Sequence, residues 1–81
     1  MADNDELKEL LQRRDDLIYV DTFTQIHGPM PSPRCKWVWE KFQGIEGIEF
    51  FLEIMQACDA IPPAYIQTVK DGTYLVAVLT E

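Results

Sequence analysis

Three glutamates at helical spacing are the residues of this chain best placed to act on another molecule. Glu46, Glu49 and Glu53 are three and four positions apart within the apolar-periodic segment 44–61. On a helix those spacings place the side chains on one strip, and the segment has no basic residue to neutralise them. Such a strip can dock on Arg and Lys side chains of a partner protein. The alternative interpretation is a solvated helix face.

Residue types that support catalysis or metal binding do not form a recognisable pattern. The single histidine, His27, lies in a proline-rich stretch, and Cys35 and Cys58 lack the spacing of a zinc or redox site. Nothing near Cys35 identifies a base that could activate it, and the chain has no glycine-rich phosphate loop. Ser32 lies between prolines and fits at most a proline-directed phosphorylation site. We therefore predict a protein that is not an enzyme, with no metal site and no cofactor.

Aromatic side chains form a second candidate surface. Trp37 and Trp39 alternate along the segment RCKWVWEKF, and Tyr74 lies in the last apolar run of the chain. If two helices cover one face of a sheet, some of these rings should project from the other face, where an aromatic patch indicates an interface. The alternative is that loop 27–33 folds over this face and makes the tryptophans part of the core.

The elements that position these residues follow from hydrophobic periodicity. Segment 44–61 is predicted to be the central helix, ended by Pro62-Pro63. Its expected buried arc consists of Ile48, Phe51, Leu52, Ile54, Met55 and Cys58. A shorter helix with a leucine stripe is expected near the N-terminus, with Asp3 or Asn4 as its N-cap.

Four segments have the β-branched and aromatic composition of strands: 17–26, 34–42, 64–70 and 73–80. Asp71-Gly72 between the last two is a strong hairpin signal. The order αββαββ predicts a single α+β domain over residues 1–81, with a four-stranded, mainly antiparallel sheet and both helices packed on one face. Because residues 73–80 are apolar on both faces, this strand is expected inside the sheet.

The net charge of the chain limits the kinds of molecule that it is expected to bind. The chain has 14 acidic and 7 basic residues, a net charge of −7. This balance argues against direct binding of nucleic acid or an anionic membrane and favours a basic protein surface. No apolar run approaches the roughly 20 residues of a membrane span, and no export signal precedes the first helix. We expect a cytoplasmic protein with free thiols.

These features predict a non-catalytic, acidic protein-binding module. We expect a small inhibitor or adaptor, of the type that phages and mobile elements encode, which occludes a basic, nucleic-acid-binding surface of its partner. The expected partner-binding residues are Glu46, Glu49, Glu53, Trp37, Trp39 and Tyr74. The alternative is a homodimeric structural or assembly subunit that pairs through the exposed aromatic sheet face.

Overall fold

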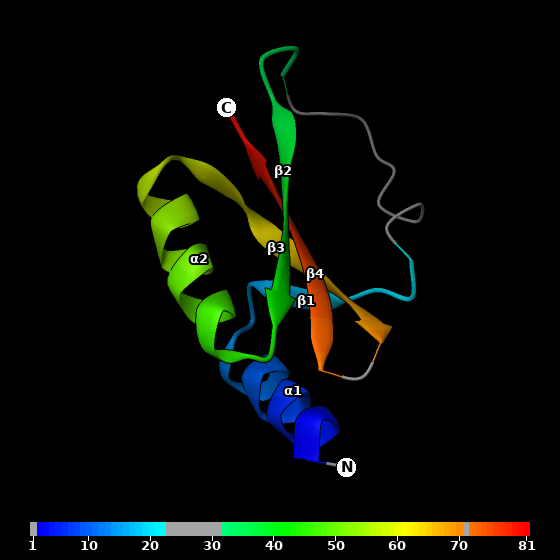
Figure 1. Cartoon of the computed structure of the whole chain (residues 1–81). Helices are drawn as coiled ribbons and strands as arrows, with labels where there is room; N and C mark the ends of the chain where they lie inside the picture. The colour runs from blue at the N-terminus through cyan, green and yellow to red at the C-terminus, as the bar shows by residue number, and fades with distance from the viewer. Residues whose placement is uncertain (1, 23–31, 71) are drawn as a thin grey trace.

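Two helices and four strands make up the part of the chain that the computed structural model describes, residues 2–22, 32–70 and 72–81. In chain order they are α1 (Ala2–Arg13), β1 (Leu17–Tyr19), β2 (Lys36–Gln43), α2 (Glu46–Ala57), β3 (Ala60–Lys70) and β4 (Thr73–Thr80). The predicted order of elements is therefore confirmed, and α2 lies beside the sheet while α1 lies at one end of it (Figure 1).

The four strands form one mixed sheet in the order β1-β3-β4-β2. β4 pairs antiparallel with both β3 and β2, whereas β1 pairs parallel with β3. The sheet is thus mainly antiparallel, as predicted, and the expected internal position of β4 is also confirmed. An internal strand covered on both faces has no need of polar alternation, and Val76 and Ala77, which point to opposite faces, are both fully buried.

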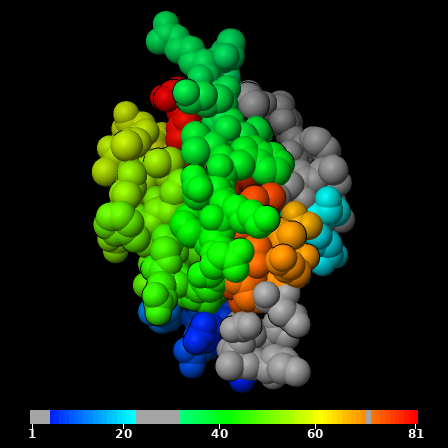
Figure 2. Space-filling view, in the orientation of Figure 1, coloured from blue at the N-terminus to red at the C-terminus, as the bar shows by residue number. Residues whose placement is uncertain are grey.

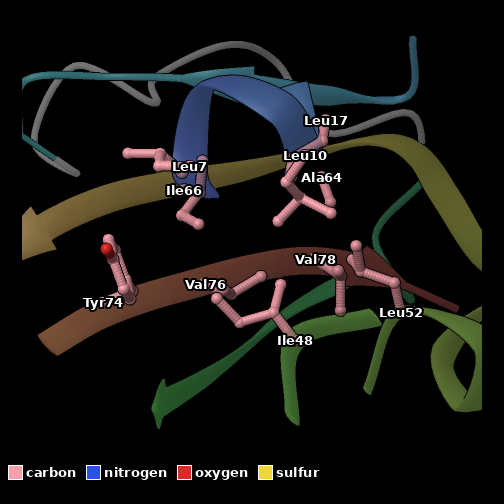
Figure 3. Close-up of a cluster of buried hydrophobic side chains, with 10 residues drawn as sticks. All are labelled: Leu7, Leu10, Leu17, Ile48, Leu52, Ala64, Ile66, Tyr74, Val76 and Val78. Carbon is pink, nitrogen blue, oxygen red and sulfur yellow. The ribbon is translucent and has the colours of Figure 1, made fainter. Parts of the chain in front are cut away.

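Both helices pack on the same face of the sheet, as the sequence predicts. α1 contributes Leu7 and Leu10 to the core, and α2 contributes Ile48 and Leu52. Figure 3 shows these side chains pointing toward β3 and β4, where they meet the core residues Ala64, Ile66, Tyr74, Val76 and Val78. The even-numbered residues of β4 therefore face the helices, and its odd-numbered residues face the opposite side.

The central helix is shorter than predicted, and the two prolines do not end it. α2 ends at Ala57, and Asp59 adopts a positive φ of 62° just beyond its end, a conformation that Asp tolerates better than most residues. Pro62 and Pro63 belong to β3 instead, joined by a cis peptide bond. Pairing of β3 with β4 is irregular between Ile61 and Tyr65, which accommodates residues that cannot donate a backbone hydrogen bond.

Other differences concern the buried arc and the first strand. Ile54 and Cys58, expected on the buried arc of α2, are exposed because the sheet contacts a narrower arc centred on Ile48 and Leu52. α1 begins at Ala2, upstream of both predicted N-caps. β1 has only three residues. Residues 23–26 of the predicted strand, loop residues 27–31 and Asp71 lie outside the described residues.

Candidate protein-binding surface on helix α2

The outer side of α2 is held away from the sheet by the residues that bury its inner side. Ile48 is fully buried and Leu52 nearly so, which fixes the rotation of the helix about its axis. The chain enters α2 from β2 through Gly44, whose φ of 85° favours glycine and whose N–H donates to the Gly72 carbonyl at 2.6 Å. In the space-filling view, α2 forms the flank of the molecule beside β2 (Figure 2).

The exposed side of α2 combines carboxylates with apolar side chains. Phe50 is 66% exposed and lies four residues after Glu46 and three before Glu53, so both glutamates are its neighbours on the helix surface. Ile54, one turn further on, is 41% exposed. We call this surface the α2 outer face and define it by its five residues, Glu46, Glu49, Phe50, Glu53 and Ile54. Phe50 is not among the site residues predicted from the sequence, although an aromatic ring on the acidic side of the helix is a signal that could have identified it.

The glutamates of the α2 outer face differ in their surroundings. Glu49 pairs with Arg13 of α1, with 2.7 Å between Oε1 and Nη2, and both side chains remain well exposed. Exposed pairs of this kind contribute at most about 1 kcal/mol. Glu46 and Glu53 have no ion-pair partner among the described residues. Of the three glutamates, Glu49 is therefore the one with an ion-pair partner among the described residues, and that partner belongs to the other helix.

A groove between the two helices extends this negative surface onto α1. It has a volume of about 230 Å³. Its lining consists of Glu6, Glu9, Arg13, Ile45, Glu46 and Glu49. Because four of these six side chains are carboxylates and one is a cation, the groove is negative overall and widens the surface that a basic partner would meet.

Asp16 ties the C-terminal end of α2 to the rest of the fold. Its carboxylate accepts two hydrogen bonds from Arg14, at 3.0 Å from Nε and 2.7 Å from Nη2, and a third from Gln56 of α2 at 2.7 Å. Its backbone carbonyl accepts a bond from the Ala64 N–H of β3 at 2.7 Å. The hydrogen bond from the Arg14 guanidinium holds the pKa of Asp16 below its usual value, against the opposing effect of partial burial.

The lowered pKa of Asp16 predicts a pH-dependent contribution to stability. A carboxyl group whose pKa is lower in the folded state stabilises the fold above its unfolded-state pKa of about 3.9, and this contribution is lost as the pH falls through the folded-state pKa. We expect Asp16→Asn to lower the free energy of unfolding by about 1–2 kcal/mol at neutral pH, and by less in acid. Urea denaturation across pH measures this. Asp15→Asn is the control. If the free energy of unfolding depended on pH in the same way in both variants, the stabilising role assigned to the Asp16 carboxylate would be contradicted.

The tryptophans lie on the other side of the sheet from α2. Val38 and Phe42 of β2 pack toward the helices, so Trp37 and Trp39, at alternate positions, face the opposite side. Trp39 is 47% exposed and Trp37 is half-buried. The Trp37 ring meets the Tyr65 ring of β3 at 5.9 Å between centroids, edge to face. The two rings therefore reach across β4, where Trp37 is paired with Leu79 and Tyr65 with Ala77.

The structure does not gather all six predicted site residues. Tyr74 is only 1% exposed and belongs to the core, because its position on β4 faces the helices. The expectation that Tyr74 projects from the open face is therefore wrong. Glu46, Glu49 and Glu53 lie on the helix side, and Trp37 and Trp39 on the far side. One flat partner surface cannot contact both groups, so they are two separate candidate surfaces.

Three further features of the described residues concern metal binding, membrane spanning and thiols. They contain no group of three or more His, Cys, Asp or Glu side chains that could hold a metal ion. Neither described helix has the length and apolar character needed to cross a membrane. Cys35 is buried, Cys58 is exposed, and both are free. No protein-family model matches the chain, and no curated protein or solved structure shows significant similarity to it.

Proposed function

We propose that this protein is a non-catalytic binding module whose α2 outer face docks on a basic surface of a partner protein. The observation that carries the proposal is the 66% exposure of Phe50 among three glutamates on a well-anchored helix. Burying an aromatic side chain is worth about 1.5–3 kcal/mol. Because Phe50 is two-thirds exposed, most of that free energy is not gained within the described fold, and a partner that covers the ring would gain it.

The residues around Phe50 define the chemistry of the partner. An exposed aromatic side chain surrounded by charged side chains resembles the centre of a protein–protein interface, where a buried anchor residue is surrounded by a polar rim. Glu46 and Glu53 would pair with Arg or Lys side chains around an apolar socket that receives Phe50 and Ile54. The net charge of −7 would also accelerate association with a basic protein.

Arg and Lys side chains of the kind that would pair with Glu46 and Glu53 are also what a nucleic-acid-binding protein presents to phosphates. We therefore propose an inhibitor or adaptor role in which the α2 carboxylates occupy positions that phosphate groups would otherwise take. The two free cysteines agree with a reducing cytoplasmic location.

Two variants of the α2 outer face test the proposal. Phe50→Ala should weaken partner binding by about 2 kcal/mol, roughly 30-fold, as expected for the anchor of an interface. Glu46→Lys with Glu53→Lys should abolish it by placing cations against cations. The matched control is Asp15→Lys with Glu81→Lys, which makes the same change in net charge at exposed positions outside α2.

The measurement is a comparative affinity purification from the native host followed by titration of the purified partner. A genuine partner is retained by the wild type and by the control but lost by both α2 variants, and its affinity falls as salt is added. If the partner binds the α2 variants as tightly as the wild type, the α2 outer face is not the binding surface. Circular dichroism of each variant verifies that the fold is intact.

A further inference from the structure

The outer edge of β2 is a backbone surface without a neighbouring strand among those described. β2 is an edge strand of the sheet, paired with β4 on its inner side, and it is eight residues long. The Gly44 N–H bonds to Gly72 directly beyond the β2–β4 ladder, so every second residue back from Gly44 also bonds to β4. The alternate positions, Trp37 and Lys41 among them, therefore direct their backbone groups to the outer edge. A long edge of this kind is a template for another strand.

We propose that a second copy of this chain pairs antiparallel with β2 along this edge, with Val38 opposite Val38 of the second copy. In this register Lys36 lies opposite Glu40 of the second copy, and Glu40 lies opposite its Lys36. Trp37 lies opposite Trp39 of the second copy, on the side of the sheet away from the helices. The edge is therefore complementary to itself in charge, and opposite charges at facing positions stabilise antiparallel pairs.

Registers shifted toward the end of β2 lack this complementarity, and the register shifted toward its start leaves Lys36 opposite Val38 and Glu40 opposite Arg34, which lies in the turn before the strand. A two-fold axis perpendicular to the sheet places the helix-covered faces of both copies on the same side of the joint sheet. The register can therefore shift only in steps that keep each residue of β2 opposite a residue of the same sheet face. The next register toward the end of β2 places Lys36 opposite Phe42 and Glu40 opposite Val38. The one after it places Glu40 opposite Glu40, which is repulsive.

The charge of β2 also favours this edge as the place where two acidic chains meet. β2 contains two lysines and one glutamate, a local charge of +1, within a chain whose net charge is −7. Mutual repulsion between two copies is therefore weaker here than at the α2 outer face. The dimer would have one continuous sheet with both α2 helices on the same side, which would present two acidic faces to one partner. This inference is independent of the proposed function.

Charge exchange across β2 tests both the edge and the register. Sedimentation velocity of the wild type over a wide concentration range should show a monomer–dimer equilibrium. Lys36→Glu alone or Glu40→Lys alone should weaken dimerisation at least about tenfold, because two attractive pairs become two repulsive ones. The double variant Lys36→Glu with Glu40→Lys should restore it. The control Lys41→Glu makes the same charge change as Lys36→Glu at a position that faces no charge in this register.

Two results would overturn the proposal. One is a wild type that stays monomeric at every concentration. The other is a dimer that ignores the single reversals or is not restored by the double variant, since the copies would then meet through another surface. Hydrogen exchange of the wild type gives a readout that needs no mutation: the amides of Trp37 and Lys41 should become more protected as concentration rises, and unchanged protection would contradict edge pairing.

Discussion

Replacing Tyr74 by alanine should lower the free energy of unfolding by about 3–5 kcal/mol, as for other large aromatic side chains removed from a core. Tyr74 is 1% exposed and packs on the helix side of the central strand β4. At about 0.05–0.15 kcal/mol per residue, a chain of 81 residues has a total stability of about 4–12 kcal/mol. The variant should therefore be largely unfolded, or close to it, at physiological temperature.

Tyr19 provides a control of the same residue type. It is 44% exposed at the end of β1, so Tyr19→Ala should cost less than about 1.5 kcal/mol. Urea denaturation followed by circular dichroism measures both variants. Similar losses would mean that the ring of Tyr74 is not enclosed between β4 and the helices.

Ile48→Ala should be the second most damaging of the changes considered, with a loss of about 2–5 kcal/mol. Ile48 is fully buried where α2 meets the sheet, and its truncation leaves a cavity that the surrounding side chains cannot fill. Because Ile48 anchors the rotation of α2, the same change should also loosen the placement of the α2 outer face.

Ile54→Ala is the matched comparison on the same helix. Ile54 is 41% exposed, and both substitutions gain the same small helix-propensity advantage of alanine. The expected loss for Ile54→Ala is below about 1 kcal/mol, measured by the same urea titration. Equal destabilisation by the two variants would contradict the narrow buried arc of α2. Retained stability with weaker partner binding would identify Ile54 as part of the interface.

Most of the architecture is predictable because it depends on local pattern. The helix period identifies Ile48 and Leu52 as buried, and the run of apolar residues in 73–80 identifies a strand covered on both faces. The Asp71-Gly72 pair indicates the hairpin whose strands the structure joins in antiparallel pairing. These signals need no knowledge of distant contacts.

The details of the candidate surfaces depend on contacts between distant segments, which the pattern does not contain. Alternation along β4 separates Tyr74 from Ala77 but does not say which of them faces the helices. The pairing of Glu49 with Arg13 requires the relative placement of two helices. The width of the buried arc, which leaves Phe50 and Ile54 exposed, depends on how closely the sheet approaches α2.

The central position of β4 has a consequence for the order of events on the ribosome. β2 pairs only with β4 among the described strands, and β4 is made after every other element. Until β4 emerges from the exit tunnel, β2 has no strand to pair with, and α2 lacks the part of its core packing that Tyr74, Val76 and Val78 supply. The apolar surfaces that β4 covers therefore stay exposed until β4 joins the sheet, an interval in which chaperone capture or premature aggregation competes with folding.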